Sequence, residues 1–322
     1  MKTEELRNQI NQMLGGNIGI MLYAVLKADE EKKVKFINIA DEEEEDNTSA
    51  GLLEGFVEVM RNKLDSYNED DEVMKLSSAD ERGNALYYYD LDELPTEMEL
   101  LRSISQRIDV GETFCFREDK LSHIIAFIVV IGNENQNIIM YKQQYPFSLL
   151  NRDRYMLTPI LHKNRLKRFD RDILRIDFNY QFFLWNGVIY ISDIGKMEKI
   201  CSFHDIILNE AKKSINEIEK TQLLDNVEVL TDELDNITFA RKLTRIYKDS
   251  KVLGKISNKS IIDFSKQHRY FKSNPIKINE AGDKFILDTK KSKEIFVKLM
   301  NDDFLTSQLT NFDYESLAKN NV

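Results

Sequence analysis

The sequence predicts an α+β protein, with a mixed, sheet-containing N-terminal and middle part and a helical C-terminal part. Apolar, β-prone runs concentrate in the first two thirds of the chain, and segments with apolar residues at helical spacing dominate the last third. The 322 residues, 42% of them apolar, are enough for two domains and a substantial core. We expect an acidic α/β region at 1–110 and a second region at 111–322, strand-rich over 111–195 and helical over 196–322.

The N-terminal region is expected to alternate between strands and helices. Residues 19–27 and 34–39 are β-prone runs separated by a polar turn. Apolar residues recur at intervals of three and four over 52–64, which predicts a helix there. Thr96 is followed three residues later by Glu99, a capping-box pattern that predicts the start of another helix.

The middle region supplies most of the predicted strands. Their expected positions are 114–116, 124–131, 138–141, 173–185 and 188–191. Asn186 and Gly187 separate the last two runs, and this dipeptide indicates a hairpin because a type I′ turn needs positive φ at both central residues. One long helix is expected to follow over 198–224.

The C-terminal third has a different pattern of elements. Two short basic helices are expected over 239–248 and 260–268, followed by a hairpin around Ala281 and Gly282 and by a helix over 293–300. The order helix, helix, hairpin, helix is found in winged-helix proteins, so this part of the chain is predicted to be winged-helix-like.

Charge is distributed unevenly along the chain. The formal net charge is −10, and residues 29–100 hold 23 acids against 7 bases. Two other segments are basic, with 9 bases against 3 acids over 141–175 and 16 bases against 6 acids over 241–298. Basic blocks within an acidic protein favour a polyanion partner on one surface. No catalytic motif of comparable strength is present.

The first basic block is the first candidate for phosphate contacts. A run of cations gains affinity for nucleic acid by releasing condensed counterions, and arginine adds bidentate geometry for phosphate oxygens. The alternative is a solvated loop whose cations pair with the acidic N-terminal region. The candidate DNA-binding residues of this block are Lys142, Arg152, Arg154, Lys163, Arg165, Lys167, Arg168, Arg171 and Arg175.

The second basic block supplies a second candidate surface on the helix predicted over 239–248. Arg241, Arg245 and Lys248 fall on one face of that helix, and Lys242 adds a fourth cation. The functional interpretation is a second surface that contacts phosphates. The alternative is an ordinary exposed helix face.

Catalysis and metal binding receive little support from the sequence. Asp109, Glu118 and Lys120 have roughly the order of a D…ExK nuclease site, but such short patterns arise by chance in a chain with 31% charged residues. The four histidines have neither the spacing nor the cysteine neighbours of a zinc site. We therefore predict no catalytic residues, no bound metal and no cofactor.

The tail of the chain resembles a known family. The segment from Asn301 to Thr310, followed by Asp313-Tyr314-Glu315, resembles the tail of the KwaB family, the soluble proteins of the two-gene Kiwa anti-phage system. The predicted hairpin over 173–191 and the helix that holds Arg241-Lys242-Leu243 also fit that family, so the resemblance covers roughly 110–322. It implies a cytoplasmic bacterial defence protein that binds DNA and acts with a membrane partner, KwaA.

Taken together, these observations favour a non-catalytic DNA-binding effector of an anti-phage system. Through its partner it would be recruited from the cytoplasm to the inner face of the cell membrane, and we also predict a homo-oligomer, a dimer. Two alternatives stay open: a metal-dependent nuclease of the same system that uses Asp109, Glu118 and Lys120, and a protein-interaction scaffold that binds no nucleic acid.

Overall fold

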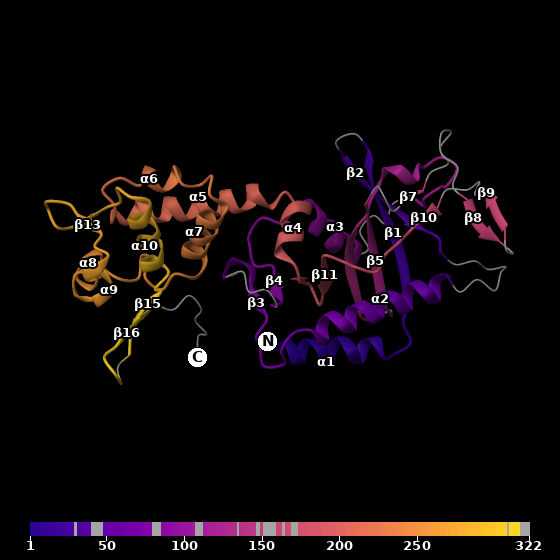
Figure 1. The fold of residues 1–322 in the computed structure, drawn as a ribbon, viewed down its shortest axis with the longest axis horizontal. Helices are drawn as coiled ribbons and strands as arrows, with labels where there is room; N and C mark the ends of the chain where they lie inside the picture. The colour runs from indigo at the N-terminus through magenta and orange to yellow at the C-terminus, as the bar shows by residue number, and fades with distance from the viewer. Residues whose placement is uncertain are drawn as a thin grey trace. The chain divides into compact units, whose positions relative to one another are not determined.

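The fold of the chain is given by a computed structural model (Figure 1). It describes residues 1–28, 31–39, 48–78, 85–106, 112–133, 135–145, 149–150, 159–162, 165–168, 173–307 and 309–315. The chain divides into two compact units. Unit 1 comprises Met1–Val73, Asn84–Tyr88 and Thr96–Cys201, and unit 2 comprises Met74–Gly83, Tyr89–Pro95 and Ser202–Val322. The division into regions at residue 110, which rests on charge and on the resemblance, stays a prediction.

The predicted α+β class is confirmed, and unit 1 is built around an antiparallel sheet. Its strands lie in the order β2-β1-β5-β6-β11-β12-β4. These strands are β1 (Gly19–Ala28), β2 (Glu31–Ile37), β4 (Tyr87–Tyr88), β5 (Ile124–Gly132), β6 (Asn137–Gln143), β11 (Phe182–Trp185) and β12 (Val188–Ile191). Two small two-stranded sheets pair β7 (Leu149–Leu150) with β10 (Ile173–Leu174), and β8 (Pro159–His162) with β9 (Arg165–Arg168).

Helices cover both faces of this sheet because its central strands are apolar on both faces. Alternate residues of β5, including Phe127, Val129 and Ile131, share one core with α1 (Thr3–Leu14) and α2 (Thr48–Asp65). On the opposite face α3 (Thr96–Ser105) packs against β6 and β11. Unit 1 ends with α4 (Ile194–Ile200). The result is a sheet enclosed between two helical layers, as Figure 1 shows.

The hairpin predicted at Asn186 and Gly187 joins β11 to β12. Asn186 has φ 49° and Gly187 has φ 79°, the positive values that a type I′ turn requires. The flanking residues Trp185 and Val188 are paired across the two strands. Local turn chemistry therefore sets the register of this pair, and it does so where the side chains of β11 are fully buried.

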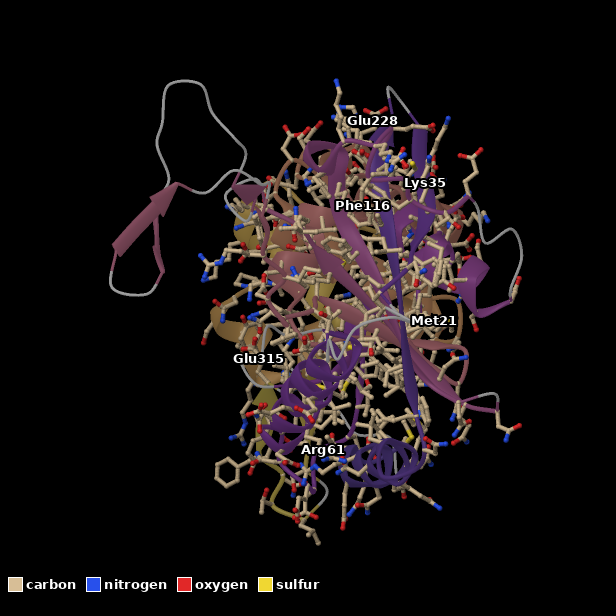
Figure 2. The ribbon with its side chains drawn as sticks, turned by 90° about the vertical axis from the view of Figure 1, so that its right-hand side faces the viewer. Met21, Lys35, Arg61, Phe116, Glu228 and Glu315 are labelled. Carbon is tan, nitrogen blue, oxygen red and sulfur yellow. The ribbon has the colours of Figure 1, made fainter. Side chains whose placement is uncertain are left out.

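Three sequence-based expectations are wrong in detail. The strand expected over 173–185 is interrupted, because only Ile173–Leu174 (β10) and Phe182–Trp185 (β11) are strands and the residues between them are not. The helix expected over 198–224 is two helices, α4 and α5 (Phe203–Thr221), because Ser202 between them adopts a left-handed conformation with φ 46°. No strand forms over 114–116; the chain turns at 116–118, where the Asp119 carboxylate accepts a hydrogen bond of 2.8 Å from the Cys115 N–H. Asp119 is held in place by Lys35, which is labelled in Figure 2.

Unit 2 is mainly helical. Besides α5 it contains α6 (Glu228–Thr231), α7 (Ile237–Asp249), α8 (Asn258–Gln267), α9 (Arg269–Ser273) and α10 (Lys290–Met300). Its short strands are β3 (Met74–Lys75), β13 (Lys277–Ile278), β14 (Phe285–Ile286), β15 (Phe304–Thr306) and β16 (Asp313–Glu315). The expected order of two helices, a hairpin and a helix is present in α7, α8, β13–β14 and α10. A winged-helix arrangement of these elements is not confirmed.

We predict that Gly187→Ala destabilises the protein by about 1–2 kcal/mol, the cost of a side chain in a left-handed conformation. Gly19→Ala is the matched control, since Gly19 lies in β1 at a φ that any residue tolerates. A Cβ would have open space at both positions, so only the backbone conformation differs. Urea denaturation measures both free energies of unfolding, and equal effects of the two substitutions would contradict the conformational explanation.

Candidate nucleic-acid interface

Most of the first basic block lies in residues 151–172, called the excursion, between two strands that pair with each other. Strands β7 and β10 pair, with Leu149 opposite Leu174, so the intervening residues start and end at the same place. These residues hold seven of the nine predicted cations of the block. The pairing of β7 with β10 therefore brings the two ends of this cation-rich segment together.

Within this excursion, β8 and β9 form a hairpin with Leu161 opposite Leu166. Arg165, Lys167 and Arg168 all belong to the four residues of β9, so the structure brings three predicted cations into one short strand. Arg175 follows β10 and is exposed. Four other predicted residues lie outside the described part of the chain: Arg152, Arg154, Lys163 and Arg171.

Lys142, in contrast, is a core residue of unit 1. It lies in β6 with a side chain that is only 1% exposed, and its Nζ lies 3.1 Å from the carboxylate of Asp177. The same ammonium donates weaker hydrogen bonds to the Gln143 carbonyl and the Gln144 amide oxygen. A buried cation needs such partners to offset its loss of hydration. The described geometry therefore gives Lys142 a structural role within unit 1.

The predicted cationic face of α7 is partly neutralised within unit 2. Arg241, Arg245 and Lys248 are all half-buried on the same side of the helix, whereas Lys242 is exposed. Arg245 lies 3.9 Å from the buried carboxylate of Asp303. Lys248 forms an ion pair with Asp92. The side of α7 that collects cations in sequence thus also meets acids of its own unit.

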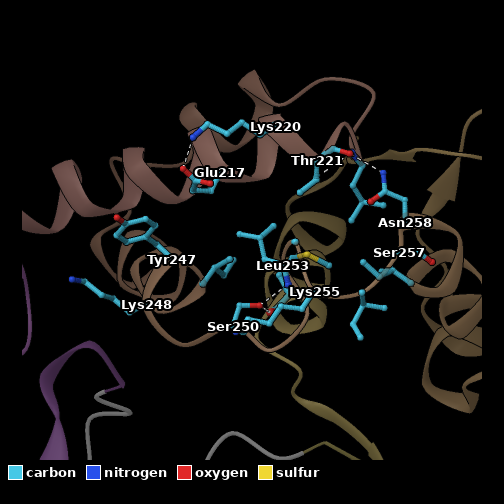
Figure 3. Close-up of a pocket in the computed structure, with 16 residues that line it drawn as sticks. Glu217, Lys220, Thr221, Tyr247, Lys248, Ser250, Leu253, Lys255, Ser257 and Asn258 are labelled. Carbon is cyan, nitrogen blue, oxygen red and sulfur yellow. Dashed lines mark hydrogen bonds and ion pairs between the residues drawn. The ribbon is translucent and has the colours of Figure 1, made fainter.

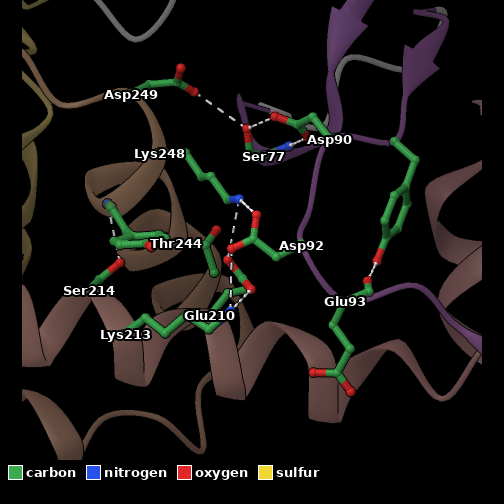
Figure 4. Close-up of polar contacts among 12 residues, drawn as sticks. Ser77, Asp90, Asp92, Glu93, Glu210, Lys213, Ser214, Thr244, Lys248 and Asp249 are labelled. Carbon is green, nitrogen blue, oxygen red and sulfur yellow. Dashed lines mark hydrogen bonds and ion pairs between the residues drawn. The ribbon is translucent and has the colours of Figure 1, made fainter. Parts of the chain in front are cut away.

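Asp92, Glu210, Lys213 and Lys248 form one charge network (Figure 4). Glu210 is completely buried on α5, and it accepts a hydrogen bond of 2.6 Å from Lys213 while Lys248 Nζ lies 3.9 Å away. The hydrogen bond from Lys248 is the main cause that lowers the pKa of Asp92, and the hydrogen bond to Glu210 raises the pKa of Lys213. Each of the two lysines is therefore held between the same two carboxylates.

A second set of contacts fixes the chain segments that bring these acids to α7. The backbone N–H of Ser77 donates to Asp90 at 2.9 Å, and Lys75 Nζ lies 2.6 Å from Asp249 at the end of α7. Sequence analysis missed this arrangement, because Asp92 lies 156 positions before Lys248 and no local pattern links them.

Beyond α7, unit 2 carries exposed cations that the sequence analysis counted but did not choose as site residues. The stretch 251–272 holds six bases and a single acid, Asp263. Its bases are Lys251, Lys255, Lys259, Lys266, Arg269 and Lys272, and all six are exposed. This stretch consequently adds six exposed cations to the described part of unit 2.

The candidate nuclease residues are not gathered into a site. Asp109 lies outside the described residues, and Glu118 and Lys120 are exposed. Asp119, between them, is bound to Lys35. Among the residues whose placement is described, no three histidine, cysteine, aspartate or glutamate side chains are grouped as metal ligands would be. Within the same residues, no helix is long and apolar enough to cross a membrane.

The fold and its charged surfaces define a two-unit α+β protein with cationic segments in both units. The family model described as Kiwa protein KwaB-like matches residues 121–310. The chain is also similar to the Kiwa protein KwaB of Escherichia coli O55:H7 (strain RM12579 / EPEC), with 32% identity over 326 aligned residues that cover 100% of this chain and 99% of the relative. The chain therefore belongs to the KwaB family, and the resemblance of its tail is confirmed. No solved structure matches it.

Substitutions at Lys142 and at Asp177 test whether their ion pair stabilises unit 1. We predict that Asp177→Asn destabilises the protein by about 1–2 kcal/mol, because it leaves the buried ammonium without a countercharge while half of the Asp177 side chain remains open to water. Lys142→Met removes the charge as well as its need for a partner, so its effect should stay within about 1 kcal/mol of the parent. Thermal unfolding of both variants measures the difference. A larger loss in Lys142→Met would contradict this account.

Proposed function

We propose that this chain, as a member of the KwaB family, is a component of a Kiwa anti-phage system that binds duplex DNA with little sequence preference. One observation carries the DNA-binding part of the proposal: seven cations lie in a single excursion whose ends are paired at β7 and β10. Clustered cations bind the phosphate backbone and read no base sequence by themselves. The exposed bases over 251–272 supply a second surface of the same chemistry.

The excursion gives the first test. Changing Lys163, Arg165, Lys167 and Arg168 together to alanine should weaken binding to every duplex sequence, since these cations would bind phosphates. The slope of log K against log salt should also become shallower, by about 0.9 for each phosphate that the variant no longer neutralises. Gel-shift titrations at several salt concentrations measure both quantities.

A charge-matched control separates a local effect from a general change in net charge. Lys27, Lys33, Arg102 and Lys199 are exposed cations of unit 1 outside the excursion. Changing these four to alanine removes the same formal charge and should leave the salt slope close to that of the parent. If both variants behave alike, or if the excursion variant keeps the parental affinity and slope while folded, the excursion is not the interface.

The second part of the proposal is that DNA binding does not lead to cleavage. The Asp109, Glu118 and Lys120 pattern is short, and two of its members are exposed side chains on the turn that follows Cys115. We expect linear and circular DNA to stay intact during long incubation with the purified protein and Mg²⁺ or Mn²⁺. Cleavage that disappears in Glu118→Gln would instead identify a metal-dependent nuclease.

The third part of the proposal is that the membrane protein KwaA recruits this chain to the membrane and that the chain forms a homodimer. A cationic surface gains only about 1 kcal/mol per cation near anionic lipid, and salt screens this attraction. Stable recruitment should therefore require a protein contact.

This part is tested by fractionating cells. Expressed alone, the chain should stay in the cytosolic fraction, and with KwaA it should move to the membrane fraction and resist a moderate salt wash. Salt-resistant membrane binding without KwaA would contradict the proposal. Measuring the mass of the purified chain in solution tests the homodimer.

A further inference from the structure

Unit 2 contains an open pocket of about 540 Å³ that the proposed function does not use (Figure 3). It lies between the C-terminal end of α5, the C-terminal end of α7, the loop over 250–257 and the start of α8. Its volume falls in the range of sites that hold small molecules. The pocket therefore has room for a ligand of the size of a single nucleotide.

The floor of the pocket is apolar and one wall is aromatic. Leu223, Ile246, Leu253, Ile261 and Met300 contribute apolar side chains to the lining. Tyr247 also lines the pocket, and it is 40% exposed. An exposed aromatic ring beside an apolar floor suits a flat, partly apolar group such as a nucleobase, which stacks on such rings.

Cations dominate the charge of the lining. Lys220, Lys248 and Lys255 line the pocket together with a single acid, Glu217. Lys248 is already paired with Asp92, so Lys220 and Lys255 are the cations that the pocket offers to a ligand. Lys220 is paired with Glu217 through side chains that are 70% and 39% exposed, an arrangement that contributes little to stability and can be exchanged for a better anion. Lys255 donates to a backbone carbonyl, that of Ser250 at 2.7 Å, so this contact does not cancel its charge. The lining thus favours a ligand that carries negative charge.

Hydrogen bonds hold the walls of the pocket in place. Ser250 Oγ donates to the Met300 carbonyl at 2.6 Å and accepts from the N–H groups of Val252 and Leu253. On the other side, Asn258 Nδ2 donates to the Thr221 carbonyl at 2.8 Å and ties the start of α8 to the end of α5. Fixed walls mean that little ordering is required when a ligand enters.

We propose that this pocket binds a free nucleoside monophosphate, with its base against Tyr247 and its phosphate beside Lys220 and Lys255. A phosphate alone would leave the aromatic wall and the apolar floor unused, and a nucleoside alone would leave the cations unused. A nucleotide can place its base against the aromatic and apolar part of the lining and its phosphate against the cations. Ser257, the N-cap of α8, and Asn258, its first residue, also line the pocket.

Isothermal titration calorimetry on the full chain tests the proposal with AMP, GMP, CMP and UMP, and with adenosine and inorganic phosphate as fragments. At least one of the four nucleotides should bind with a Kd on the order of 1 mM or tighter, and more tightly than either fragment. No saturable binding by any nucleotide would overturn the proposal. Inorganic phosphate that binds as tightly as the best nucleotide would also overturn it, because the pocket would then be a simple anion site.

Matched variants place the ligand in the pocket. Tyr247→Leu should weaken nucleotide binding about tenfold, whereas Tyr247→Phe should keep it, since only the leucine removes the ring on which the base stacks. Lys220→Gln with Lys255→Gln should weaken binding by a similar factor. Lys212→Gln with Lys266→Gln changes two exposed lysines of unit 2 outside the lining and should have no effect.

The variants also keep this proposal separate from DNA binding. The alanine variant at Lys163, Arg165, Lys167 and Arg168 should bind the nucleotide like the parent. Equal losses in the pocket variants and in their lysine controls, or an unchanged affinity in Tyr247→Leu, would overturn the assignment of the ligand to this pocket.

Discussion

The burial of β5 and β6 on both faces is the constraint on which unit 1 depends. Strand β5 has no face that can meet water, so α1 and α2 must cover one side and α3 the other. A sheet enclosed in this way has no room for a patch of charges. Most of the cations of the middle region accordingly lie outside the strands of this sheet, in the segment between β7 and β10. Lys142 remains inside, and its ammonium meets Asp177 there.

The parts of the fold that depend on local chemistry could be predicted from the sequence. The apolar run of β5 predicts a buried strand from its residue types alone. The Asn186-Gly187 dipeptide likewise predicts its turn, because these two residue types tolerate the positive φ that the turn requires. The break at Ser202 could not be predicted, since nothing in the apolar pattern around it forbids a continuous helix. The turn that replaces the strand expected over 114–116 has a different origin, because it depends on a contact from Asp119, which lies outside that segment.

In the candidate interface, too, local features could be predicted from the sequence and contacts between distant segments could not. Clusters of cations are visible in the sequence, and so is the shared helical face of Arg241, Arg245 and Lys248. Their partners are not visible, because Asp92 and Asp303 lie on other segments that reach α7 only in the folded unit. The pocket beside Tyr247 is also assembled from several elements that are distant in the sequence. No local sequence motif could therefore predict it.

The pairing of Lys248 with Asp92 means that the charge displayed by α7 is not encoded in α7 alone. A relative with an identical α7 but a neutral residue at the position of Asp92 would offer an additional cation to solvent. Natural variation in the segment 89–95 can therefore adjust the electrostatic character of this helix while its own sequence stays constant. When KwaB family members are compared, the bases on α7 should be counted together with the acids that this distant segment brings to them.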